Sequence, residues 1–304
     1  DHDQLLNYTI WGLCVEPTEH NRANPDAVAI VEREMSDIYG KEWRDSGNLS
    51  YYQTLMHRTD NHELFSAINF CGVFIILFDD YLDNIFDIDE IRQWQHKYRT
   101  GQSDGQTPMD RMLVKAIARL NHWLSIEQMR RHANYVCDFI ETYITLMQFK
   151  LSPNEHGDIM SYEEFLALRQ ADSLYNLLFL FTELSSGFDP HQHGMGDSEL
   201  LEAFTVACGK HCTLTNELYS FRKEVRAGAG DYNYMYLIMC REGCTAQVAA
   251  NRIVMELHDI WALGVNYGAQ LKALANPALD QYVSEALHTV KGHLYWASIC
   301  RRYK

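Results

Sequence analysis

Long apolar runs and prolines are both scarce in this chain. The most apolar stretch, 64–78, is interrupted by Ser66 and Asn69. It is shorter than the roughly 20 residues that a membrane-spanning helix needs, so we expect no stable membrane insertion. The 304 residues include only six prolines, at positions 17, 25, 108, 153, 190 and 277. Because proline interrupts helices, the long stretches between these positions are free to be helical.

Positive charge is also scarce. The 41 acidic residues outnumber 26 lysines and arginines, which gives a net charge of −15 and a pI near 5.3. Nucleic-acid binding needs clustered basic side chains, so we expect no nucleic-acid partner. If the ligand is a polyphosphate, cations must mediate its binding to this acidic chain. The chain begins at Asp1 without an initiator methionine, so we expect that its native start and any targeting signal are missing and that the residues present form a soluble cytoplasmic protein.

The cysteines lack the dense pattern of a disulfide scaffold. Eight cysteines are scattered through the chain, several inside apolar helical runs, and we expect them to be reduced core residues. Cys208-x-x-His211-Cys212 and Cys240-x3-Cys244 leave a joint zinc site open. Neither has the C-x2-C spacing that is common in structural zinc sites.

Helical periodicity dominates the chain. Apolar residues recur at i, i+3, i+4 and i+7 in five long segments, and no sustained period-2 alternation is present. These segments are 125–151, 161–186, 197–226, 244–274 and 276–300. Polar and glycine-rich stretches predict loops at 101–107, 152–158, 187–197 and 227–231. The sequence therefore predicts an all-α fold of ten or eleven helices, in a single domain spanning 1–304.

Three proline positions also predict where helices begin. Asn24-Pro25, Thr107-Pro108 and Asn276-Pro277 each place a capping residue before a proline, and a periodic apolar run follows. A short polar side chain can accept hydrogen bonds from the free backbone N–H groups of a first turn, and proline is tolerated there. We expect a helix to start at each of these pairs.

Three aspartates follow the apolar segment 62–78. If the helix continues, Asp79 and Asp83 project from one face, one turn apart, and Asp80 lies beside them. The carboxylates repel one another at the negative end of the helix dipole, which is unfavourable unless cations bind. A solvated helix end explains the same cluster equally well.

A second polar pattern lies within 197–226. Asn216, Ser220 and Glu224 are spaced i, i+4 and i+8, so they form one oxygen-bearing stripe on a helix. Amide, hydroxyl and carboxylate oxygens suit Mg²⁺, with water and phosphate completing the coordination. Alone, the stripe is also typical of a polar helix face. The two clusters, about 130 residues apart in an all-helical chain, reinforce each other.

Together these clusters resemble the DDxxD and NSE motifs of class I terpene synthases, the terpene cyclases, of the microbial type with a single α-domain. Arg169 lies 47 residues before Asn216, where such enzymes carry a diphosphate-sensing arginine. Asp172 and Ser173 follow at the linker and effector spacing. The resemblance spans nearly the whole chain.

Two further features of the resemblance are Lys223, directly before the last NSE residue, and Arg302-Tyr303, which resembles the family's RY pair. Two positions depart from the pattern. Glu217 stands where relatives usually have Asp, which we expect to cost little because that side chain is not a usual metal ligand. Ser173 stands where many relatives have Gly, and we expect this to affect the product more than the ionisation step.

The resemblance implies a helical bundle with a central active-site cavity, three Mg²⁺ ions and an isoprenyl diphosphate substrate. The enzyme would ionise geranylgeranyl or farnesyl diphosphate, cyclise the carbocation to a di- or sesquiterpene and release pyrophosphate. The implied metal ligands are Asp79, Asp80, Asp83, Asn216, Ser220 and Glu224. The implied diphosphate contacts are Arg169, Lys223, Arg302 and Tyr303.

The sequence also suggests residues of the prenyl pocket. Ile75 and Ile76 precede Asp79 by about one helical turn, which places them deeper in the expected cavity and leaves room for a long chain. Aromatic faces can stabilise a carbocation without acting as nucleophiles. The aromatic candidates, each of which taken alone is more typical of core packing, are Phe74, Tyr175, Phe179 and Trp296.

Other classes stay open. An isoprenyl diphosphate synthase has a similar first motif, but it carries a second aspartate-rich motif where this chain has the sequence of 216–220. A di-iron bundle needs two Glu-x-x-His motifs, and only Glu285-Ala-Leu-His288 is found. A non-catalytic helical interaction protein would show no magnesium-dependent release of pyrophosphate. The sequence leaves a homodimer open.

Overall fold

The computed structural model describes residues 5–16, 26–45, 47, 49–85, 87–151, 161–228 and 230–303. Within these residues the structure has twelve α-helices, two short 3₁₀ helices and no strand, so the predicted fold class is confirmed. The α-helices are α2 (Ala27–Tyr39), α3 (Leu49–Met56), α4 (His62–Leu82), α5 (Ile88–Thr100), α6 (Pro108–Asn121), α7 (Ile126–Leu151), α8 (Tyr162–Asp172), α9 (Tyr175–Ser186), α10 (Glu199–Arg226), α11 (Tyr234–Glu242), α12 (Ala246–Lys272) and α13 (Pro277–Ile299). The 3₁₀ helices are η1 (Gly230–Tyr232) and η2 (Arg301–Tyr303).

The predicted helix starts are confirmed where they are described. Thr107 forms a capping box with Asp110, with Pro108 in the first turn of α6. Asn276 caps α13, because its side chain accepts hydrogen bonds from the backbone N–H groups of Ala278 and Leu279, and Pro277 is the first residue of the helix. Asn24-Pro25 and the expected loop 152–158 lie outside the described residues.

One long predicted segment is wrong in detail. The stretch 161–186 is two helices, because Leu174 adopts a left-handed backbone with φ of 50° between α8 and α9. Periodicity does not reveal this break, because the apolar spacing continues through it. The break contributes to a helix count above the ten or eleven expected.

The helix bearing the aspartates also extends further than its apolar segment. α4 continues to Leu82, so Asp79 and Asp80 lie in its last turn and Asp83 is its C-cap. Among the described helices α4 is the one long and apolar enough to cross a membrane, but 67% of its apolar window is buried inside the protein. That burial is what a core helix of a globular bundle shows.

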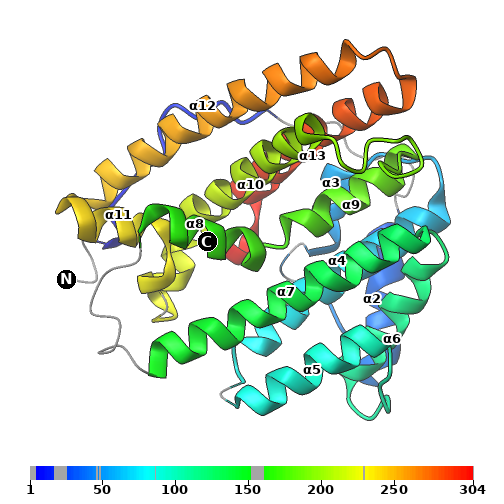
Figure 1. Cartoon of the computed structure of the whole chain (residues 1–304). Coiled ribbons are helices and arrows are strands. Elements are labelled where there is room, and N and C mark those ends of the chain that lie inside the picture. The colour runs from blue at the N-terminus through cyan, green and yellow to red at the C-terminus, as the bar shows by residue number, and fades with distance from the viewer. Residues whose placement is uncertain are drawn as a thin grey trace.

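The helices form a bundle around α10 and α13, which lie side by side near its centre (Figure 1). α12 runs along one side with the N-terminal segment 5–16 beside it, and α5 and α6 lie on the opposite side. The C-terminal turn η2 lies near the middle of the bundle, against α10. Residues from α4, α10 and the C-terminal turn η2 can therefore meet.

Candidate active site

A cavity of about 250 Å³ lies where α4, α7, α8, α9, α10, α13 and η2 converge. It brings together both predicted ligand clusters and most of the other predicted residues. The predicted residues that line it are Ile75, Ile76, Asp79, Asp83, Arg169, Asp172, Ser173, Tyr175, Asn216, Ser220, Lys223, Glu224, Trp296, Arg302 and Tyr303. Phe74 and Phe179 lie in the core instead, and neither lines this cavity.

The aspartates form the acidic edge of the cavity. Ligand oxygens of Asp79, Asp80 and Asp83 all lie within 4.8 Å of one another, the one such group of acidic, histidine or cysteine side chains found among the described residues. The zinc site that the sequence left open at Cys208, His211, Cys212, Cys240 and Cys244 is not among the groups found in the described residues. The surrounding protein desolvates Asp79 and raises its pKa, although Arg302 and a hydrogen bond from Tyr143, 2.6 Å from Oδ1, oppose that shift.

Across the cavity, α10 presents the oxygen-bearing stripe. The hydroxyl of Ser220 is buried and has no hydrogen-bond partner, which is costly unless a ligand completes it. Glu224 accepts a hydrogen bond from Asn233 Nδ2 at 2.9 Å, which fixes its carboxylate. Asn216 Nδ2 donates to the hydroxyl of Tyr303 at 2.7 Å. An unpaired buried hydroxyl beside an amide and a carboxylate fits a divalent cation.

Glu217, which the sequence analysis did not place in the site, holds Arg169 at the cavity wall. It is fully buried and accepts hydrogen bonds from Arg169 Nε at 2.8 Å and from the backbone N–H of Tyr234 at 2.7 Å. Arg169 also pairs with Asp172. Burial lowers the pKa of Arg169, but the carboxylates of Glu217 and Glu224 outweigh burial and raise it, so the guanidinium stays charged at the cavity wall.

The C-terminal turn and α10 each bring one cation to the aspartates. Arg302 donates to Asp80 Oδ1 at 2.7 Å and to Asp79 Oδ2 at 3.3 Å. Lys223 Nζ lies 3.8 Å from Asp80 Oδ1. Asp80 does not line the cavity itself, but it is bound to residues that do. Three segments far apart in sequence thus converge on one edge.

The remaining wall is largely apolar and aromatic. The ring of Trp296 lies 4.6 Å from that of Tyr52 and 5.5 Å from that of Tyr303, measured between centroids. Ile75 and Ile76 line the cavity as well. Sequence reasoning missed Tyr52, Tyr143 and His293, because nothing in their local spacing distinguishes them from core residues. Asn233, which contacts Glu224, could have been noticed from the sequence, because an asparagine before an apolar run is typical of a helix N-cap and it caps α11.

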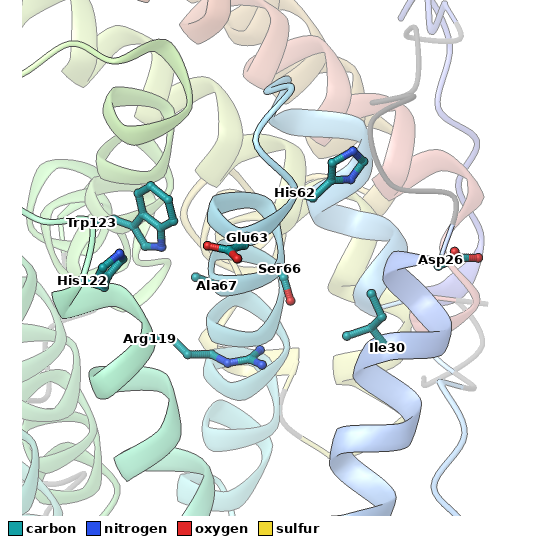
Figure 2. Close-up of a pocket in the computed structure, with 9 residues that line it drawn as sticks. All are labelled: Asp26, Ile30, His62, Glu63, Ser66, Ala67, Arg119, His122 and Trp123. Atoms are coloured by element: carbon teal, nitrogen blue, oxygen red, sulfur yellow. The ribbon is translucent and has the colours of Figure 1, made fainter.

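A second hollow of about 490 Å³ opens between α2, α4 and α6 (Figure 2). It is lined by Asp26, Ile30, His62, Glu63, Ser66, Ala67, Arg119, His122 and Trp123. Arg119 is paired with Glu34, and the acidic and basic groups here do not gather into a metal-ligating cluster among the described residues. The larger hollow therefore lacks the donor set that the smaller cavity has.

Residues 71–262 match the protein family described as terpene synthase family 2, C-terminal metal binding. This range covers more than half of the 304 residues and contains both ligand clusters. The chain belongs to this terpene synthase family, and its metal-binding domain implies a divalent metal ion. This membership agrees with the predicted terpene synthase rather than with an elongating synthase or a non-catalytic protein.

Individual relatives agree with the family. The chain is 21% identical over 235 residues to the bifunctional terpene synthase Agr4 of Cyclocybe aegerita, which covers 74% of this chain and 68% of that one. The 2-methylisoborneol synthase of Streptomyces coelicolor A3(2), solved with Mg²⁺ and geranyl-S-thiolodiphosphate, matches 98% of both chains with a TM-score of 0.79 and 16% identity. The linalool/nerolidol synthase of Streptomyces clavuligerus, solved with 2-fluorogeranyl diphosphate, matches 95% of this chain and 99% of its own with a TM-score of 0.78 and 16% identity. These structures establish the class I terpene synthase fold.

Proposed function

We propose that this terpene synthase is a magnesium-dependent cyclase that ionises a C15 or C20 isoprenyl diphosphate and releases pyrophosphate. One observation carries the proposal: Asp79 and Asp83, at the end of α4, and the stripe of α10 face a single cavity whose remaining wall is largely apolar and aromatic, and Asp80 lies beside those two aspartates. We also propose that residues 1–304 form one catalytic domain, since helices from both halves of the chain line that cavity.

The donor set fits magnesium. Carboxylate, hydroxyl and amide oxygens are hard ligands, and Mg²⁺ commonly shares its coordination with phosphate oxygens and water. We propose three ions, two held by Asp79, Asp80 and Asp83 and one by Asn216, Ser220 and Glu224. When bound, they would offset the charge of the diphosphate and stabilise it as a leaving group.

The protein's own cations would bind the same group. Arg169, Lys223 and Arg302 all line the cavity near the ligand clusters, and the hydroxyl of Tyr303 lies beside them. Donors fixed before the reaction stabilise the charge that develops on the leaving oxygen without reorganising. Glu217 keeps Arg169 in place, so Arg169 needs little rearrangement to contact diphosphate.

The apolar wall would protect the carbocation. Water would quench an allylic cation, so the prenyl chain must fold in a cavity that excludes it. Trp296 and Tyr52 present aromatic faces there, and aromatic faces attract a cation without reacting as nucleophiles.

We propose that the pocket accepts geranylgeranyl diphosphate as readily as farnesyl diphosphate, or better. Ile75 and Ile76 line the cavity one turn below Asp79, and aliphatic side chains there leave more depth than aromatic ones. Competition between the two diphosphates in one reaction tests this. A kcat/KM at least tenfold higher for farnesyl diphosphate would refute it.

The function itself is tested by incubating the protein with C10, C15 and C20 isoprenyl diphosphates and Mg²⁺. We expect cyclic hydrocarbons by gas chromatography with mass spectrometry, one pyrophosphate per product, and no turnover in excess chelator. Elongated diphosphates in the presence of isopentenyl diphosphate would instead identify a chain-elongating synthase.

A further inference from the structure

The junction between α8 and α9 brings a strained backbone to the cavity wall. Leu174 has a φ of 50°, an uncommon value for a residue with a side chain. Leu174 and Tyr175, the first residue of α9, both line the cavity. Such a conformation persists only when surrounding contacts hold it. Tyr175 follows Leu174 directly, so its contacts help to hold this backbone in place.

The ring of Tyr175 packs against α10 at Gly209, a residue without a side chain. A Cβ atom added at Gly209 would stand 2.0 Å from Tyr175 Cδ2, 2.3 Å from Cε2 and 2.5 Å from Cγ. These separations are far below any van der Waals contact, so the ring occupies the space that a side chain at position 209 would take. Gly209 is buried and does not line the cavity.

We propose that Gly209 is a specificity-determining residue, because it sets how far the ring of Tyr175 stands back from the space that the prenyl chain occupies. This inference rests on the proposed cyclase function and concerns a C15 or C20 substrate. Gly209 itself touches no substrate and is a positioning residue, whereas Tyr175 forms part of the wall.

The packing around Tyr175 predicts where a displaced ring would go. Tyr175 is 6% exposed and belongs to a buried cluster with Phe179, Cys208 and Cys212. Outside this cluster, its hydroxyl interacts electrostatically with Tyr135 and Glu202. Protein interiors are close-packed, so those residues leave no room for an aromatic ring. The unfilled space next to Tyr175 is the cavity. A side chain at position 209 should therefore push the ring into the cavity and shorten it.

The test compares Gly209→Ala with wild-type enzyme. We expect a different product ratio and at least a threefold shift in kcat/KM towards the shorter of two competing diphosphates. Gly264→Ala is the matched control, because Gly264 is also buried in a long helix facing α10 but an added Cβ would lie 3.9 Å from Ala207 Cβ and Cys208 Sγ. Both changes gain the same helix propensity, so only Gly209→Ala adds the clash.

Repeating the substitution in a Tyr175→Leu variant distinguishes an effect that acts through the ring from one that acts through the backbone of α10. Tyr175→Leu removes the ring and should itself alter the products, and Gly209→Ala added to it should change nothing further, as a double-mutant cycle would show. Unchanged products in Tyr175→Leu, or an equal effect of Gly209→Ala with and without the ring, would overturn the proposal even if Gly209→Ala alone failed to fold. Wild-type enzyme that forms no hydrocarbon would instead refute the proposed function.

Discussion

Ser220 and Glu217 lie three residues apart on α10, and their hydrogen bonding differs sharply. The hydroxyl of Ser220 is buried at the cavity without a partner, whereas both carboxylate oxygens of Glu217 are bound. An unpaired buried polar group costs about 1–3 kcal/mol, which a ligand can recover. The pattern therefore separates a side chain ready to bind something from one that holds its neighbours.

Removing a single proposed metal ligand should remove most turnover without unfolding the protein. We expect Asp79→Ala, Asn216→Ala and Glu224→Ala each to lower kcat/KM by on the order of 100-fold, since each deletes a preorganised polar group at the reacting diphosphate. Helical circular dichroism should be unchanged, because none of the three belongs to a buried apolar cluster. Glu202→Ala, an exposed acidic residue on the same helix α10, is the control. Wild-type activity in any one variant would remove that residue from the proposed site.

At the scale of elements, the N-terminal segment 5–16 is hydrogen-bonded to α10. The hydroxyl of Tyr8 donates to the carbonyl of Leu218 at 2.9 Å, and Arg222 donates to the carbonyls of Leu6 and Tyr8. The guanidinium also lies 4.1 Å from the centre of the Tyr8 ring. These contacts hold the turn of α10 that carries the predicted metal ligands.

Removing the contacts of Arg222 with the N-terminal segment should lower both the stability of the protein and its affinity for Mg²⁺. We expect Arg222→Ala to lower the free energy of unfolding by about 1–3 kcal/mol, because two hydrogen bonds and a cation–π contact are lost. The Mg²⁺ concentration for half-maximal turnover should rise, since Ser220 and Glu224 lie on either side of Arg222. Thermal unfolding and magnesium titration measure the two effects, with the exposed Arg226→Ala as control. An equal effect of Arg226→Ala would show that general loss of charge is responsible.

The C-terminal turn η2 should close more firmly over ligand. Arg302 is bound to Asp79 and Asp80, and Tyr303 to Asn216, so this turn joins both clusters. We expect amide hydrogen exchange at 301–303 and 227–231 to slow when Mg²⁺ and pyrophosphate are added together. Amides of α12, which does not line the cavity, serve as the internal reference. Unchanged exchange at saturating ligand would contradict closure.

At the scale of the whole molecule, the sequence predicted the fold class and the approach of the ligand clusters. Helical periodicity placed α7, α10, α12 and α13 within two residues of their observed bounds. Spacing alone placed Asn216, Ser220 and Glu224 on one face, and the structure confirms that all three line one cavity. Such features depend on local geometry, which a sequence pattern expresses directly.

Contacts between distant elements could not be predicted in this way. The ring of Tyr175 against Gly209, the hydrogen bond of Tyr8 to α10 and the bond of Glu217 to Arg169 each join separate segments. Phe74 and Phe179 have the same residue type as cavity-lining aromatics, yet they point into the core. Which face of a helix meets the cavity depends on tertiary packing, and periodicity does not specify it.

Buried histidines should make the whole bundle sensitive to acid. Burial lowers the pKa of His57 and His293 to about 3, and those of His132, His211 and His288 to about 4. The unfolded chain has histidine pKa values of about 6.5, so it binds these protons first. Stability is therefore complete above pH 6.5 and is lost as the pH falls towards the folded values.

At pH 5.5 each of these five histidines should cost about 1.4 kcal/mol, or about 7 kcal/mol together, which is comparable with the total stability of about 5–15 kcal/mol of a typical domain. Burial also raises the pKa values of Asp79, Glu183 and Glu217, which act in the opposite direction, but they are three groups against five. We expect the urea midpoint, followed by circular dichroism in chelator, to fall steeply between pH 7.5 and 5.5. His132→Gln should flatten that dependence by about one proton, since glutamine can keep the hydrogen bond to Tyr98 but does not titrate. Equal midpoints at the two pH values would show that these histidines are not held neutral by burial.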